Sequence, residues 1–320
     1  MKKTLLMTAL LLAGLCFASC EKDDTTDTQN NPTENPNTNP NPDPGTDPDP
    51  AGNGFNANGA STAVFSVGEG ETVRFSKGNL QYQASTGTWR FAENQYDCIG
   101  ADNNQIADDN ENWIDLFGYG TSGWNSGAQS YQPYSTNSSY SNYLNKDLTG
   151  AYAEADWGVY NAISNGGNRA GMWRTLTKQE WTHLLLTRSA STIGNTDNAR
   201  YAKATVSGKK GLIIFPDSYT HPDGVDMPTA INNSGASFNA NTYAPSHFAK
   251  MQAAGAIFLP AGGYRSGYQI LEREDFGHYW STSVGSGYSA YEMVFNAVNL
   301  TVTDVSRNNG CSVRLVQDVE

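Results

Sequence analysis

Aromatic side chains set in polar loops are the residues of this sequence whose type and spacing best suit a chemical task. Tyrosine and tryptophan rings can stack on the face of a sugar while a neighbouring guanidinium or amide hydrogen-bonds its hydroxyls. The candidate ligand-binding residues stand among Ser, Asn and Gly and are Trp124, Tyr131, Tyr134, Tyr264, Arg265 and Tyr268. The alternative is that these rings anchor long loops to the core.

Cysteine and histidine predict little further chemistry. Beyond residue 20 the chain has only Cys98 and Cys311. Outside the cell such a pair can form a disulfide, and the alternative is two separate buried thiols. The four histidines show neither an HExxH motif nor a pair at helical spacing, so no metal site is predicted.

An acidic stretch runs from Asp102 to Asp115 and also contains several asparagines. Carboxylate and amide oxygens are the ligands that calcium prefers, but the glycine that an EF-hand loop needs at its turn is absent. A solvated acidic loop is the favoured interpretation, and calcium binding stays open. No cofactor is predicted.

The overall composition restricts the class of protein. The chain has 320 residues and a formal net charge of -12, and this acidic balance argues against nucleic acid as a partner. Only 16% of the residues are charged, below the roughly 25% typical of soluble domains. Since Gly, Tyr and Trp are plentiful, the composition disfavours a helical bundle and favours a loop-rich α+β fold.

The N-terminus has the pattern of an export signal. Lys2 and Lys3 precede a short apolar run, which residues 15–20 (LCFASC) close in a way that resembles a bacterial lipobox. Residues 1–19 are therefore predicted to be a lipoprotein signal peptide, with lipidation of Cys20 as the membrane anchor. The alternative is an ordinary secretory signal. The acidic residues 21–24 (EKDD) resemble a signal for display on the outer face of the outer membrane.

A tether and one domain follow the signal. Residues 20–59 are rich in Pro, Asn and Asp and contain no run of apolar residues, so they are predicted to be a disordered stalk. Residues 60–320 are predicted to form a single domain, since no second linker interrupts them.

Periodicity predicts mostly strands in that domain. Alternating apolar residues indicate strands near residues 73–75, 80–82, 89–91, 202–206, 212–215 and 256–259. Three segments near residues 291–295, 300–302 and 311–315 are predicted to form an antiparallel meander. A capping box at Thr177 and Glu180 predicts a helix, and weaker helices are expected over residues 152–163 and around 247–253.

Four segments resemble a known family. They are residues 172–181 (MWRTLTKQEW), 259–265 (LPAGGYR), 277–283 (GHYWSTS) and 310–316 (GCSVRLV). Their order and spacing resemble the Fibrobacter succinogenes major paralogous domain and formylglycine-generating-enzyme-like domains of bacterial surface lipoproteins. The resemblance implies a C-type-lectin-like core with antiparallel strands, few helices and long irregular loops. Thr175-Leu176 stands where Leu-Pro is usual, and Leu315 where Cys is common.

The predicted function is non-catalytic binding of an extracellular glycan or protein by a lipid-anchored surface protein. Enzymes of the resembled family use a pair of cysteines, and neither Cys98 nor Cys311 matches that pair by position. The protein is therefore expected not to be an enzyme. The alternative is a structural or adhesive surface component without a small-ligand pocket, and a formylglycine-generating-like enzyme is a third hypothesis.

Overall fold

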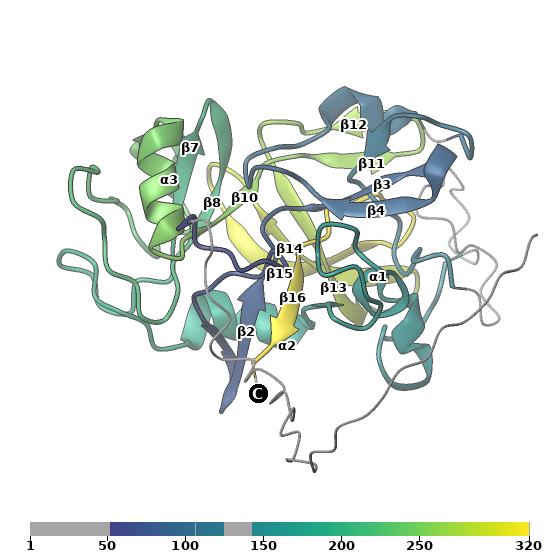
Figure 1. The fold of residues 1–320 in the computed structure, drawn as a ribbon, viewed down its shortest axis with the longest axis horizontal. Helices are drawn as coiled ribbons and strands as arrows, with labels where there is room; N and C mark the ends of the chain where they lie inside the picture. The colour runs from purple at the N-terminus through teal and green to yellow at the C-terminus, as the bar shows by residue number, and fades with distance from the viewer. Residues whose placement is uncertain (1–51, 106, 125–142, 320) are drawn as a thin grey trace, which may run out of the picture. The chain divides into compact units, whose positions relative to one another are not determined.

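The computed structural model describes residues 52–105, 107–124 and 143–319 (Figure 1). The predicted signal, Cys20 and most of the predicted stalk lie outside these residues. The described chain is mostly antiparallel β-structure with a few short helices, which confirms that part of the predicted fold class. Phe55 is already buried against the core, so the packed part of the domain begins before residue 60.

One four-stranded sheet joins early and late parts of the chain. In spatial order its strands are β1 (Phe65–Gly68), β2 (Glu71–Phe75), β16 (Leu315–Asp318) and β6 (Arg174–Thr175), and all neighbours are antiparallel. The alternation that predicted β2 is confirmed, because Val73 and Phe75 are both buried. β16 therefore lies inside this sheet and not at its edge.

A second four-stranded sheet is built on a long hairpin. In spatial order its strands are β10 (Ile257–Pro260), β8 (Lys209–Ile214), β7 (Tyr201–Val206) and β9 (Thr242–Tyr243), and only the β7–β9 pair is parallel. Helix α3 (Pro245–Ala253) lies beside this sheet (Figure 1) and confirms the helix expected around residues 247–253. Its Phe248 ring packs edge-on against Phe258 of β10, with 5.7 Å between ring centroids.

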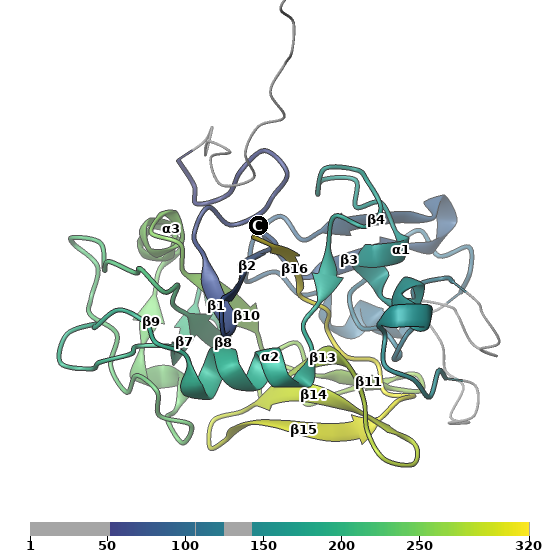
Figure 2. The same cartoon turned by 90° about the horizontal axis from the view of Figure 1, so that it is seen from below.

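The C-terminal part contains a three-stranded antiparallel meander (Figure 2). It consists of β13 (Gly277–Val284), β14 (Ser289–Phe295) and β15 (Leu300–Ser306). The predicted meander was wrong in its last strand, because the chain after Cys311 leaves to become β16. Burial alternation identifies the buried face of a strand but not its partner. Next to the meander, β11 (Tyr264–Ser266) and β12 (Gln269–Leu271) form a separate hairpin.

Another small sheet has the order β4 (Thr88–Phe91), β3 (Leu80–Gln83) and β5 (Trp113–Ile114). Two short 3-10 turns lie between its strands, η1 (Ala84–Thr86) and η2 (Gly100–Asn104), and a third, η6 (Phe238–Ala240), lies between β8 and β9. These strands and 3-10 turns are short because the segments between them are rich in Gly, Asn and Asp, which favour turns.

The predicted capping box starts helix α2 (Lys178–Thr182), which continues as one π-type turn, η5 (His183–Thr187). Thr177 Oγ1 accepts the Glu180 N–H at 3.1 Å, and Glu180 Oε2 accepts the Thr177 N–H at 2.6 Å. Helix α2 contacts β1 on one side and β13 and β14 on the other, so it lies between the first sheet and the meander (Figure 2). Among the described residues, no helix has the length and apolarity needed to cross a membrane.

The helix expected over residues 152–163 is wrong in its continuity. The structure has a 3-10 segment, η4 (Gly150–Ala155), and a single helical turn, α1 (Trp157–Tyr160). Asp156 between them is extended, with φ -75° and ψ 134°. Its carboxylate accepts the Thr175 N–H at 2.7 Å, so a contact with β6 takes the place of helical continuity.

Successive residues of β13 face two different hydrophobic clusters. Tyr279 packs with Trp181 and Phe295 in one cluster, whereas Trp280 packs with Cys311 and Val313 in the other. Because side chains alternate along a strand, His278 shares the face of Trp280.

Candidate functional site

The predicted aromatic residues have different environments. Tyr131 and Tyr134 lie outside the described residues. Trp124 is half-buried and packs edge-on against Tyr152, with 6.4 Å between ring centroids, so this ring anchors its loop to the core. Tyr268, at the turn of the β11–β12 hairpin, is 68% exposed. Of the described candidates it is the one whose ring faces solvent.

Tyr264 and Arg265 on β11 are placed differently from the prediction. Tyr264 is half-buried, and its ring lies 5.0 Å from that of His278. Arg265 is fully buried, and its backbone N–H and carbonyl both pair with Gly310 at 2.8 Å. Its guanidinium is therefore not at the surface in this conformation, and its role in ligand binding stays a prediction. Burial lowers the pKa of this guanidinium.

Cys98 and Cys311 are both free thiols. Of the two alternatives that the sequence left open, the structure therefore has two separate thiols. Cys98 is half-buried, and burial together with nearby Asp115 raises its pKa to about 11. Cys311 is fully buried, and burial next to Glu292 raises its pKa well above the ordinary value. Neither thiol is activated as a nucleophile, since that requires a lowered pKa.

Asp115, the last residue of the acidic stretch, holds that end of the stretch in place. Its buried carboxylate accepts the Ile99 N–H at 2.9 Å and the Asn103 side-chain amide at 2.7 Å. Burial raises its pKa to about 6. Asp102, in contrast, is exposed. These contacts give Asp115 a structural role and leave its oxygens committed to hydrogen bonds.

A buried cluster of histidine, carboxylate and thiol groups lies where strands β13 and β14 meet the segment around Cys311. His278 Nδ1 is 3.0 Å from Glu292 Oε2, and the same carboxylate oxygen is 3.4 Å from Cys311 Sγ. His278 Nε2 is 3.1 Å from Glu272 Oε2 at the end of β12. We call His278, Glu292 and Cys311 the HEC cluster. Among the described residues it is the one group of three such side chains whose ligand atoms lie within 4.8 Å of one another.

Strand pairing builds the HEC cluster. His278 faces Val294 across the β13–β14 pair, so Glu292 is its diagonal neighbour on the same face. Cys311 is held by backbone hydrogen bonds to Phe117, at 2.9 and 3.0 Å. The next residue, Ser312, is hydrogen-bonded to the backbone of β13, and these bonds hold the segment of Cys311 against that strand.

The charges of the cluster favour a protonated histidine. Burial by itself lowers the pKa of His278, but hydrogen bonds and charge from Glu292 and Glu272 outweigh it, and the net pKa is raised. The ring can then donate one N–H to each carboxylate. The stabilisation gained in this way is complete below the unfolded pKa of about 6.5 and is lost as the pH rises through the higher folded pKa.

The HEC cluster could not be predicted from the sequence. His278 and Glu292 stand on two strands whose register cannot be obtained from one sequence. Cys311 comes from a third segment, so the usual spacing signals of metal sites are absent. The alternation of the strands put His278 and Cys311 on buried faces, which was the one available signal.

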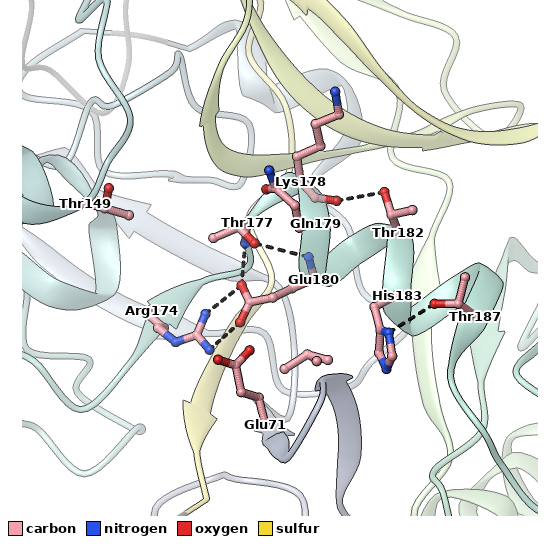
Figure 3. A pocket seen from close by; sticks show the side chains of 12 residues that line it. Glu71, Thr149, Arg174, Thr177, Lys178, Gln179, Glu180, Thr182, His183 and Thr187 are labelled. Carbon is pink, nitrogen blue, oxygen red and sulfur yellow. Dashed lines mark hydrogen bonds and ion pairs between the residues drawn. The ribbon is translucent and has the colours of Figure 1, made fainter.

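A groove of about 780 Å³ runs along the start of helix α2 (Figure 3). Its walls come from the β1–β2 hairpin, the start of η4, β6 and the helix itself. They carry mostly hydroxyl, amide and charged side chains: Glu71, Thr149, Arg174, Thr177, Lys178, Gln179, Glu180, Thr182, His183 and Thr187.

Ion pairs fix the shape of the groove. Arg174 makes a bidentate pair with Glu180, at 2.6 and 2.9 Å, and also binds Asp318 of β16 at 2.6 Å (Figure 3 shows the first of these). Lys178 Nζ lies 3.6 Å above the ring of Tyr291. In contrast, the side chains of Thr149 and Gln179 are exposed and have no hydrogen-bond partner among the described residues. They are therefore available to a ligand.

Comparisons of this chain with protein-family models, with curated proteins and with solved structures found no match. The resemblance described above therefore rests on its four motifs. These motifs meet in space: Thr175 pairs with Leu315, Tyr279 with Ser312, and Arg265 with Gly310.

Proposed function

We propose that this protein is a lipid-anchored surface protein whose C-type-lectin-like domain binds an extracellular glycan without catalysis. The groove beside helix α2 is the observation that carries the proposal. Its volume of about 780 Å³ falls in the range of roughly 300–1,000 Å³ that is usual for ligand pockets. The adjacency of the four motifs supports the lectin-like assignment, and the signal-like N-terminus supports the anchor at Cys20.

The groove offers a sugar both apolar surface and hydrogen-bonding groups, because most of its accessible lining surface is apolar while many of its side chains end in hydroxyl, amide or charged groups. Sugar hydroxyls both donate and accept hydrogen bonds, and the free Gln179 amide and Thr149 hydroxyl can do the same. The Arg174–Glu180 pair holds both charges in place before a ligand arrives, which reduces the ordering cost of binding. A protein segment with exposed polar side chains is the other partner that such a groove suits.

Glycan binding should depend on Gln179. We expect the Gln179→Ala variant of the full chain to bind its strongest glycan-array ligand about 5- to 30-fold more weakly, since one or two hydrogen bonds of roughly 1 kcal/mol are lost. Dissociation constants from titration calorimetry measure this change. The matched control is Gln269→Ala, an exposed glutamine on β12 outside the groove.

The control also separates two binding surfaces. If Tyr268→Ala and Gln269→Ala weaken binding while Gln179→Ala does not, the hairpin and not the groove is the binding surface. If no glycan binds the wild-type protein, the proposal fails and the structural or adhesive alternative is favoured.

The anchor is tested independently of the ligand. When the full chain is expressed in a lipoprotein-producing bacterium, radiolabelled palmitate should be incorporated into the wild type and lost in Cys20→Ala. Cys16→Ala, which removes a cysteine four residues earlier, should keep the label. Label that persists in Cys20→Ala would show that the anchor is elsewhere.

A further inference from the structure

We propose that the HEC cluster is a binding site for a divalent transition-metal ion, with Zn²⁺ as the best match. The ligands are His278 Nδ1, a carboxylate oxygen of Glu292 and Cys311 Sγ. This site is separate from the proposed glycan groove, with which it shares no residue.

The donor set points to this class of ion. One nitrogen, one oxygen and one sulfur atom form a borderline-soft set, and zinc is bound by these three donor types. Calcium and magnesium prefer oxygen ligands alone. Three protein ligands leave a fourth position for the second oxygen of Glu292 or for a water molecule.

The distances fit an ion with small adjustments. In a tetrahedral zinc site with bonds of about 2.0–2.3 Å, ligand atoms lie about 3.3–3.8 Å apart. His278 Nδ1 and Glu292 Oε2 are 3.0 Å apart, Glu292 Oε2 and Cys311 Sγ are 3.4 Å apart, and all three atoms lie within 4.8 Å. Shifts of a few tenths of an ångström up to about one ångström therefore close the site around an ion.

Glu272 supplies the outer support that metal-bound histidines usually have. Its carboxylate accepts a hydrogen bond from Nε2 of His278, at 3.1 Å, which leaves Nδ1 free to bind the metal. The Glu272 side chain is 40% exposed, whereas that of Glu292 is 3% exposed. Glu272 is therefore the part of this hydrogen-bonded group that faces solvent, and Glu292 the part that faces the interior.

The charges are balanced with and without the ion. The groups that face His278 and Cys311 are Glu272 from β12, Glu292 from β14, and Tyr264 and Arg265 from β11. A dication replaces two protons, one on His278 Nδ1 and one on Cys311 Sγ, so the net charge of this buried region does not change. Metal sites whose ligands must lose protons release them on binding.

Proton release distinguishes this site from adventitious surface binding. The full chain, treated with a chelator and then freed of it, is titrated with ZnCl₂ at pH 6.0 in a weakly buffered solution. We expect one Zn²⁺ per chain and release of about two protons per ion, because both groups are protonated at this pH. Binding without a fixed stoichiometry, or with no proton release, would overturn the proposal.

Cobalt provides a measurement that does not depend on any variant. Co²⁺ in the wild-type protein should give a sulfur-to-cobalt charge-transfer band and the intense visible bands of a tetrahedral site, and absence of the charge-transfer band refutes the role of Cys311. Cys311→Ser should lose the band and bind Zn²⁺ at least about 10-fold more weakly. Cys98→Ser, which alters the thiol outside the cluster, should leave both unchanged. Equal loss in the two variants would also overturn the proposal.

Discussion

Replacing Trp181 by alanine should lower the free energy of unfolding by about 3–5 kcal/mol, the range for large aromatic side chains removed from a core. Trp181 is fully buried on helix α2. Its ring lies 6.2 Å from that of Phe75 and 6.5 Å from that of Tyr279, so it joins the first sheet to the meander. Its Nε1–H donates to the Trp280 carbonyl at 3.2 Å.

Both the cavity and the lost hydrogen bond contribute to this cost. Alanine leaves a void between two sheets that cannot close without moving one of them, and the Trp280 carbonyl loses a donor. Denaturant unfolding of the full chain, followed by far-ultraviolet circular dichroism, measures the change. The matched control is Trp124→Ala, since that ring is only half-buried and should cost less than half as much. A cost below about 1 kcal/mol for Trp181→Ala would contradict the packing described.

Replacing Asp156 by alanine should cost about 3 kcal/mol, because a buried acceptor of several hydrogen bonds disappears. The carboxylate accepts the Thr175 N–H at 2.7 Å, the Thr175 hydroxyl at 2.9 Å and the Gly158 N–H at 3.2 Å. Asp156 is 1% exposed, so water cannot replace it. The variant removes both the cap of α1 and its connection to β6.

The cost of Asp156→Ala should also depend on pH. Burial raises the pKa of Asp156 to about 6, above the unfolded value of about 3.9. The wild type is therefore stabilised most by this residue at low pH, and this contribution declines as the pH rises from about 4 to about 6. The difference in unfolding free energy between wild type and variant should accordingly be larger at pH 4 than at pH 7.

Asp108→Ala, at an exposed position, should change stability by less than about 0.5 kcal/mol. A loss of stability equal to that of Asp156→Ala would contradict the role assigned to Asp156.

Local signals in the sequence predicted local structure well. The capping box at Thr177 and Glu180 and the alternation of β2 are confirmed because each depends on neighbouring residues only. The continuous helix over residues 152–163 was wrong because Asp156 hydrogen-bonds Thr175, a contact across the fold that helical periodicity does not report. The position of β16 was missed for the same kind of reason, since its partners are remote in the sequence.

The candidate sites were less accessible to sequence reasoning. Aromatic residues in polar loops looked alike, yet Trp124 packs on the core while Tyr268 faces solvent. Arg265 followed a polar pattern and is nevertheless fully buried. The HEC cluster depends on strand register, and the groove depends on three stretches of the chain that meet, around residues 67–71, residue 149 and residues 174–187. Neither leaves a spacing pattern in the chain.

The interior place of β16 has a consequence for the order of folding. β2 and β6 are joined through residues 315–318, so this sheet cannot close until those residues have been made. Pairings of such high sequence separation form slowly, since a long loop must close first. The first sheet is therefore expected to close after the β7–β8 hairpin and the meander, whose paired strands are neighbours in the sequence.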